Sequence, residues 1–150
     1  MITSCPLRCI TVRQPWAEAI AAGLKLVENR SRSVRYRGPI GIHAGLRDDP
    51  GAWTTKLIMG AAKDLTFGTN GYAAGAIVAL ADLVDCHPTR SWDPCCQPWG
   101  EAGGNVHHLV LANVRRLPAP VLARGSLALP WTAPEDAATQ VWDQLATVAT

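Results

Sequence analysis

A succession of short segments that alternate polar and apolar residues, interrupted by glycine and proline, constrains the fold of this chain most. Five segments are typical of strands: residues 8–13, 25–30, 40–44, 75–84 and 106–114, of which residues 75–84 form the most apolar one and not an alternating one. Helical spacing of apolar residues appears only after Pro15, after Pro50 and in residues 134–148, so strands and helices do not alternate as in parallel α/β proteins. The order predicts an α+β fold: a small β-barrel with a short N-terminal helix, an inserted helix and a C-terminal helix packed outside it.

The length and the apolar content limit the domain organisation. The 150 residues suffice for one domain and are too few for two comfortable ones, and an apolar fraction of 48% excludes an intrinsically disordered chain. The longest apolar run, residues 73–81, is too short to span a membrane, and the first residues lack the apolar stretch of a signal peptide. We expect one domain over residues 1–150, with a core of residues 8–131 and a C-terminal helix of residues 134–148, in the cytoplasm and away from membranes.

Positive charge is concentrated in the first third of the chain, although the net charge is only +2. The segment 25–37 holds five basic residues and one acidic residue. Such a concentration can attract an anionic polymer such as RNA. Charged residues also commonly protect the edge of a sheet, and charge by itself favours this second interpretation.

Two strings of residues resemble the ASCH domain family. Residues 10–17 read Ile-Thr-Val-Arg-Gln-Pro-Trp-Ala, and the spacing G-x-K-x-x-E-x-R follows at every fixed position of the family signature: Gly23, Lys25, Glu28 and Arg30. Three later strings resemble further strands of the family: residues 41–44, 75–79 and 108–111. The resemblance extends over about residues 8–131.

The resemblance implies a PUA-like β-barrel and a cleft between the first helix and the barrel, lined by the signature. Members of the family are proposed to bind RNA. Some small members resemble amidohydrolases that deacetylate N4-acetylcytidine, and others are described as ribonucleases. In those amidohydrolases a threonine nucleophile stands at the place of Glu28, and a carboxylate is an uncommon nucleophile toward amides, which argues against the same route here.

The signature residues have a chemistry that suits a nucleotide. Glu28 and Arg30 are two residues apart in a predicted strand, so we expect their side chains on one face. A guanidinium binds a phosphate or a base edge, and a carboxylate accepts hydrogen bonds from exocyclic amines of bases. Lys25 could place a positive charge at the mouth of the cleft and exchange protons with Glu28. If the protein is an enzyme, Lys25 and Glu28 are therefore the expected catalytic residues.

Further residues could complete a nucleic-acid site. The start of the first helix, beside Arg13 and Gln14, could hold a phosphate, and Trp16 could stack on a base. The complete expected set is Arg13, Gln14, Trp16, Lys25, Glu28, Arg30, Arg32, Arg35 and His43. Structural alternatives stay open: Trp16 could fill the core, Glu28 and Arg30 could form a structural pair, and Lys25 could be a solvated strand end. His43 is more often a satisfied core histidine, and Arg32 and Arg35 could only solvate a loop.

Residues 86–105 are rich in proline, glycine, tryptophan and cysteine, which predicts a long irregular loop. Trp92 and Trp99 could cover the cleft or only pin this loop. The weak candidates for zinc ligands are Cys86, Cys95, Cys96 and His108. Their spacing is not that of paired C-x-x-C motifs, and adjacent cysteines do not easily bind one tetrahedral ion. We therefore expect reduced thiols, no metal and no cofactor, with a divalent metal only if the protein is a ribonuclease.

These observations favour a module that binds RNA or a modified nucleotide in the cleft between the first helix and the barrel. One alternative is a ribonuclease or an amidohydrolase that acts on RNA or N4-acetylcytidine through Lys25 and Glu28. The other alternative is a protein-interaction module. The sequence leaves the preferred base and the oligomeric state open.

Overall fold

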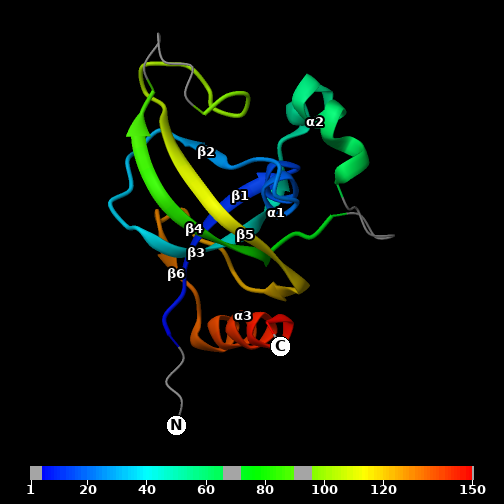
Figure 1. Cartoon of the computed structure of the whole chain (residues 1–150), viewed down its shortest axis with the longest axis vertical. Coiled ribbons are helices and arrows are strands. Elements are labelled where there is room, and N and C mark those ends of the chain that lie inside the picture. Colours follow the sequence, from blue (N-terminus) through cyan, green and yellow to red (C-terminus); the bar gives the residue numbers. More distant parts are fainter. Residues whose placement is uncertain (1–4, 66–71, 90–95, 150) are drawn as a thin grey trace.

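The computed structural model describes residues 5–65, 72–89 and 96–149, shown as a cartoon in Figure 1. Its helices and strands follow in the order β1 (Arg8–Gln14), α1 (Trp16–Ala21), β2 (Val27–Arg30), β3 (Gly38–Asp48), η1 (Pro50–Thr54), α2 (Lys56–Ala61), η2 (Ala62–Asp64), β4 (Ala76–Pro88), β5 (His107–Leu122), β6 (Trp131–Thr132) and α3 (Glu135–Val148). Of these, η1 and η2 are short 3₁₀ helices.

The strands form one mixed sheet in the order β2-β5-β4-β3-β1-β6. β1 runs parallel to β3, whereas the other neighbouring strands are antiparallel. The predicted α+β class is confirmed, but a closed barrel is not, because no ladder joins the edge strands β2 and β6 in the described part of the chain. The sheet nevertheless curls, since Arg30 of β2 donates a hydrogen bond to the backbone oxygen of Thr11 in β1.

The alternation of side chains along β1 divides the apolar core into two main clusters. Ile10 and Val12 lie in the cluster that packs against α1. Cys9 points to the other cluster, which includes Ala137 and Val141 of α3. α3 accordingly lies on the opposite side of the sheet from α1 and α2 (Figure 1). α1 thus packs on one face of the sheet, and α3 covers the other.

β5 is longer than the sequence pattern indicates. It continues past residue 114 through Pro118 and Pro120 to Leu122. Its pairing with β4 shifts in register between Ile77 and Ala79, so the prolines lie in an irregular stretch where a missing N–H costs no ladder bond. Two exposed prolines can therefore stay inside a strand.

Two further boundaries differ from the sequence-based expectation. The inserted helix is divided into η1, α2 and η2, because Thr55 adopts an extended conformation and caps α2 by accepting a hydrogen bond from the Ile58 N–H. The loop expected from residue 86 begins later, because Cys86, His87 and Pro88 still pair with β5. Within the three described ranges, no helix is both long enough and apolar enough to cross a membrane.

Candidate nucleic-acid site

The charged ends of the signature residues converge on Glu28. In β2, Glu28 lies opposite Leu109 of β5, a core residue, so its side chain points to the inner face of the curled sheet. The Lys25 Nζ lies 3.0 Å from one carboxylate oxygen of Glu28, and the Arg30 Nε lies 3.5 Å from the other. The predicted common face of Glu28 and Arg30 follows from the period of two along a strand. We call Lys25, Glu28 and Arg30 the Glu28 cluster.

The three side chains of the Glu28 cluster differ in their access to solvent. The exposed fraction is 4% for Lys25, 11% for Glu28 and 25% for Arg30. Lys25 precedes β2, and its ammonium donates to the backbone oxygen of Val27 as well as to Glu28. The ammonium therefore lies beneath the carboxylate, and the guanidinium of Arg30 is the most accessible group of the cluster.

Two tryptophans lie beside the Glu28 cluster. The Lys25 Nζ is 5.9 Å from the ring centroid of Trp16, which meets Trp99 edge to face at 6.4 Å. The Trp16 indole N–H donates to Asp49, which fixes the ring on α1. Asn29 fixes the turn that carries Trp99, because its side-chain amide donates to the Trp99 oxygen and accepts from the Glu101 N–H. The sequence pattern did not indicate a role for Asn29, because its position between Glu28 and Arg30 places it on the opposite face of β2 from those two residues.

Gln14 has a structural role at the beginning of α1. Its side chain is buried, donates to the backbone oxygen of Ala73 and accepts from the Glu18 N–H. One of the N–H groups that we expected to hold a phosphate therefore already donates its hydrogen bond to the Gln14 side chain. With only six residues, α1 also offers a weak dipole for an anion.

His43 is a core histidine on the other face of the sheet. Its ring lies 3.2 Å from the Thr11 hydroxyl and 2.7 Å from the Ala123 oxygen, and it meets Trp131 edge to face at 5.3 Å. Burial lowers the pKa of His43 below its ordinary value, and the hydrogen bond to Ala123 opposes this only in part. The structure does not bring His43 to the Glu28 cluster.

A family model described as "ASCH domain" matches residues 10–120. The chain belongs to the ASCH domain family. The match includes the signature residues, α1, β2, β3 and β4, and most of β1 and β5.

Two relatives and two solved structures are similar to parts of this ASCH domain. The mouse protein described as "Activating signal cointegrator 1" is 37% identical over 84 residues, and the human protein of that description is 34% identical over 84 residues. Each match covers 52% of this chain and only 14% of the relative. A crystal structure of ASCH from Zymomonas mobilis has a TM-score of 0.44 at 15% identity, and covers 77% of this chain and 72% of that one.

A tyrosine-to-phenylalanine mutant of the Zymomonas mobilis protein is a further structural neighbour of this ASCH domain. Its TM-score is 0.50 at 14% identity, and the superposition covers 92% of this chain and 96% of that one. At this identity the likeness concerns the fold alone.

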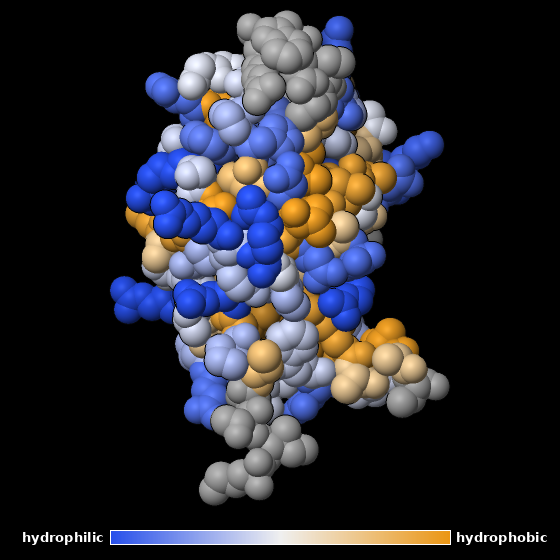
Figure 2. Space-filling model, turned by 60° about the vertical axis from the view of Figure 1, so that its left-hand side comes forward, coloured by the Kyte–Doolittle hydropathy of each residue, from blue (hydrophilic) through white to orange (hydrophobic). Residues whose placement is uncertain are grey.

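The remaining arginines of the ASCH domain lie on its surface. Arg32 and Arg35 are exposed in the segment that joins β2 to β3, shortly after Arg30. In Figure 2, strongly hydrophilic side chains extend across the middle of the face shown, beside apolar ones. Arg13 is exposed elsewhere: together with Arg47 and Arg124 it lines a cavity of about 1070 Å³ that also includes His43. The expected set is therefore divided between the Glu28 cluster with Trp16, the surface segment, the buried Gln14 and this cavity, which we call the Arg124 cavity.

The weak metal candidates do not all come together in the ASCH domain. The Cys86 Sγ accepts a hydrogen bond from the Val34 N–H, so it faces a different neighbour from the other candidates. Cys95 lies outside the described residues, as does Trp92. Cys96 and His108 do approach each other, and His87 joins them. The sequence did not indicate His87 as a ligand, because its pairing with His108 across β4 and β5 is not visible in the sequence.

Proposed function

We propose that this ASCH domain binds single-stranded RNA or a nucleotide, and that Arg30 makes the central contact. The observation that carries the proposal is the position of the Glu28 carboxylate between the Lys25 ammonium and the Arg30 guanidinium. Because Glu28 and the Thr11 oxygen both engage the guanidinium, its plane is held in one orientation. A fixed guanidinium suits a phosphate or the edge of a base.

The surroundings of Arg30 suit a nucleic-acid chain. Trp16 and Trp99 provide half-buried aromatic rings beside the cluster, and stacking of a base on an aromatic ring contributes about 1–3 kcal/mol. Arg32 and Arg35 follow on the surface and would contact phosphates of the continuing strand. The link between the ASCH family and RNA supports the same conclusion. In this arrangement Glu28 and Lys25 orient Arg30, whereas Arg30 and the tryptophans contact the ligand.

Fluorescence anisotropy with a labelled single-stranded RNA of mixed sequence, at several salt concentrations, tests the proposal. We expect Arg30→Gln to weaken binding at every salt concentration. We expect Arg32→Gln and Arg35→Gln each to reduce the slope of log affinity against log salt by about 0.7, because each removes one phosphate contact. Arg124→Gln is the matched control, since Arg124 lines the Arg124 cavity and is not part of the Glu28 cluster. Absence of salt-dependent RNA binding, or a loss only in the control variant, would contradict the proposal.

The same geometry supports binding over catalysis by Lys25. A general base or nucleophile must reach the substrate, and the Lys25 ammonium lies beneath Glu28 and is bonded to the Val27 oxygen. We therefore expect no turnover of labelled RNA, with or without Mg²⁺, and none of N4-acetylcytidine. Turnover that disappears in a folded Lys25→Ala variant would instead establish the ribonuclease or amidohydrolase alternative.

The Arg124 cavity favours protein interaction as another candidate function. Three exposed leucines, Leu46, Leu122 and Leu127, line it together with its arginines. Apolar side chains with a basic rim suit a partner segment that carries leucines and acidic residues. The name of the mouse and human relatives, a signal cointegrator, is compatible with protein partners. Titration with a synthetic peptide of alternating leucine and glutamate tests this: Arg124→Glu should abolish binding, and Arg30→Gln should leave it unchanged.

A further inference from the structure

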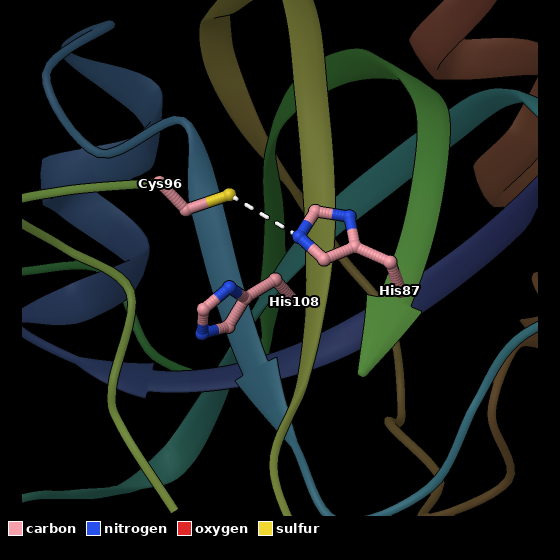
Figure 3. A group of neighbouring side chains, drawn as sticks. All are labelled: His87, Cys96 and His108. Carbon is pink, nitrogen blue, oxygen red and sulfur yellow. Dashed lines mark hydrogen bonds between the residues drawn. The ribbon is translucent and has the colours of Figure 1, made fainter. Parts of the chain in front are cut away.

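Two histidines face each other across the neighbouring strands β4 and β5. His87 of β4 lies directly opposite His108 of β5 in the ladder, and their ring centroids are 5.4 Å apart. The turn that begins at Cys96 brings a thiol to the same place, and the three side chains are directed toward one another (Figure 3). One ligand atom from each residue lies within 4.8 Å of the other two.

Hydrogen bonds to neighbouring groups fix the tautomer of each ring. The His87 Nδ1 is 2.8 Å from the Asp85 carboxylate and donates to it, which leaves the lone pair on Nε2, 3.6 Å from the Cys96 Sγ. Histidine ligands of metals usually donate their other N–H in this way to a carboxylate or a carbonyl.

His108 is held in the complementary way. Its Nε2 lies 2.7 Å from the Thr89 hydroxyl and 2.8 Å from the Glu101 oxygen. The Thr89 hydroxyl donates to the same Glu101 oxygen, and a carbonyl only accepts, so the proton is assigned to Nε2. The lone pair therefore lies on Nδ1. His108 is only 3% exposed, and its Nδ1 has no hydrogen-bond partner among the described residues. A buried polar atom without a partner is costly, so this nitrogen requires an explanation.

We propose that His87 Nε2, Cys96 Sγ and His108 Nδ1 bind one Zn²⁺ ion, with solvent in the fourth position. Imidazole and thiolate together suit zinc, whereas magnesium and calcium prefer oxygen. Tetrahedral zinc with a Zn–S bond of about 2.3 Å and a Zn–N bond of about 2.0–2.1 Å places sulfur and nitrogen about 3.6 Å apart. The Cys96 Sγ and the His87 Nε2 are 3.6 Å apart.

A catalytic triad is an alternative role for the same residues, but it explains fewer of the observations. Asp85, His87 and Cys96 have the order of a carboxylate–histidine–thiol triad, in which the thiol is a nucleophile. A triad leaves the buried His108 Nδ1 without a partner, whereas a zinc ion engages all three ligand atoms. The metal therefore explains the whole arrangement.

The ion would fix the turn after Cys96 against the sheet. Gly100 already packs closely there, since a Cβ at this position would lie 2.9 Å from the Cys96 Cβ and 2.9 Å from the His108 Cε1. Trp99 belongs to the same turn and contacts Trp16 beside the Glu28 cluster. Zinc at this place would hold Trp99 in position against Trp16. The inference does not depend on the proposed RNA binding, because it rests on the donor set.

Titration of the chelator-treated, reduced full chain with Co²⁺ and then Zn²⁺ tests the proposal. We expect one equivalent of Co²⁺ to give the visible bands of a tetrahedral ion and a thiolate-to-cobalt charge-transfer band, both lost when Zn²⁺ displaces it. Zn²⁺ should raise the Tm. Cys96→Ser should remove the charge-transfer band. Asp85→Asn alters an exposed carboxylate outside the donor set, so the variant should fold, keep the band and bind Zn²⁺ about 10–100-fold more weakly.

Two matched variants separate this site from other thiols and imidazoles of the chain. Cys86→Ser and His107→Gln change neighbours of the ligands that are outside the donor set, so both should bind Co²⁺ and Zn²⁺ as the parent does. The proposal is overturned if the parent gives no charge-transfer band, or if the band survives Cys96→Ser. Alkylation of Cys96 by iodoacetamide that Zn²⁺ does not slow would also overturn it and would favour the nucleophilic thiol.

Discussion

The guanidinium of Arg116 in β5 binds both carboxylate oxygens of Glu18 in α1, with the Nη1 of Arg116 lying 2.9 Å from the Oε2 of Glu18. Glu18 is buried, whereas Arg116 is partly exposed. The paired contact has the two-fold geometry that makes arginine–carboxylate bonds strong. It fixes the helix that carries Trp16 to a strand nearly a hundred residues away.

Loss of the Glu18 carboxylate should destabilise the protein. We expect Glu18→Ala to lower the free energy of unfolding by about 3 kcal/mol, because it removes both bonds to Arg116 and opens space beneath α1. Urea denaturation measures this. Asp143→Ala removes an exposed acid from α3 and should change the value by less than about 0.5 kcal/mol. Equal effects of the two substitutions would mean that the Glu18 pair is not important for stability.

The Glu28 cluster should show strong coupling between Lys25 and Glu28. Glu28→Leu leaves the buried ammonium of Lys25 without its carboxylate, and we expect a loss of about 3 kcal/mol in unfolding free energy. Adding Lys25→Met should recover at least about 1 kcal/mol, because the unpaired charge is gone. A double-mutant cycle by chemical denaturation measures the coupling. Additive losses would indicate that the two groups do not interact.

Burial of His43 gives the stability a defined dependence on pH. Because the pKa of His43 is lower in the folded protein than the ordinary 6.5, the unfolded chain binds a proton at higher pH than the folded one. The contribution is therefore complete above the unfolded pKa and is lost as the pH falls through it toward the folded pKa. Unfolding free energies across this range should fall less steeply for His43→Gln than for the parent. Identical slopes would refute the assignment.

Gly125 should not tolerate a side chain, because it lies against the His43 ring. A Cβ at this position would lie 2.6 Å from the His43 Cε1 and 2.9 Å from the Thr11 Oγ1. We expect Gly125→Ala to lower the free energy of unfolding by about 1–3 kcal/mol. Gly60→Ala is the matched control: its Cβ would meet open space in α2, so it should raise stability by about 0.4–1 kcal/mol. Thermal denaturation of both variants should give shifts of opposite sign.

Cys9 should resist alkylation in the folded protein. Burial raises the pKa of its thiol to about 12, so both access and thiolate are lacking at mildly alkaline pH. Cys5 is exposed and should react with iodoacetamide under the same conditions. Peptide mass spectrometry before and after unfolding in urea measures both sites. Equal labelling of the two cysteines in the native protein would contradict the buried position of Cys9.

The parts of the fold that depend on near neighbours in the chain are predictable from the sequence. The alternation of residues 8–13 and the common face of Glu28 and Arg30 are both present in the structure. The prolines of β5 are misleading, because a local rule against proline in strands ignores a register shift in the partner strand. The sequence is also misleading for Lys25. A lysine at the end of a strand suggests exposure to solvent, but Lys25 is buried, because burial depends on the residues that pack over the side chain.

The sequence by itself determined the ASCH signature, the α+β class and the spacing that directs an acid and a guanidinium to one side of a strand, because the period of a strand is a local property. Only the tertiary structure decided that Arg116 meets Glu18, that His87 faces His108 and that Cys96 joins them. These meetings depend on the register between distant strands and on the packing of a turn against a sheet. Such relations arise from the sum of many contacts and not from any short stretch of residues.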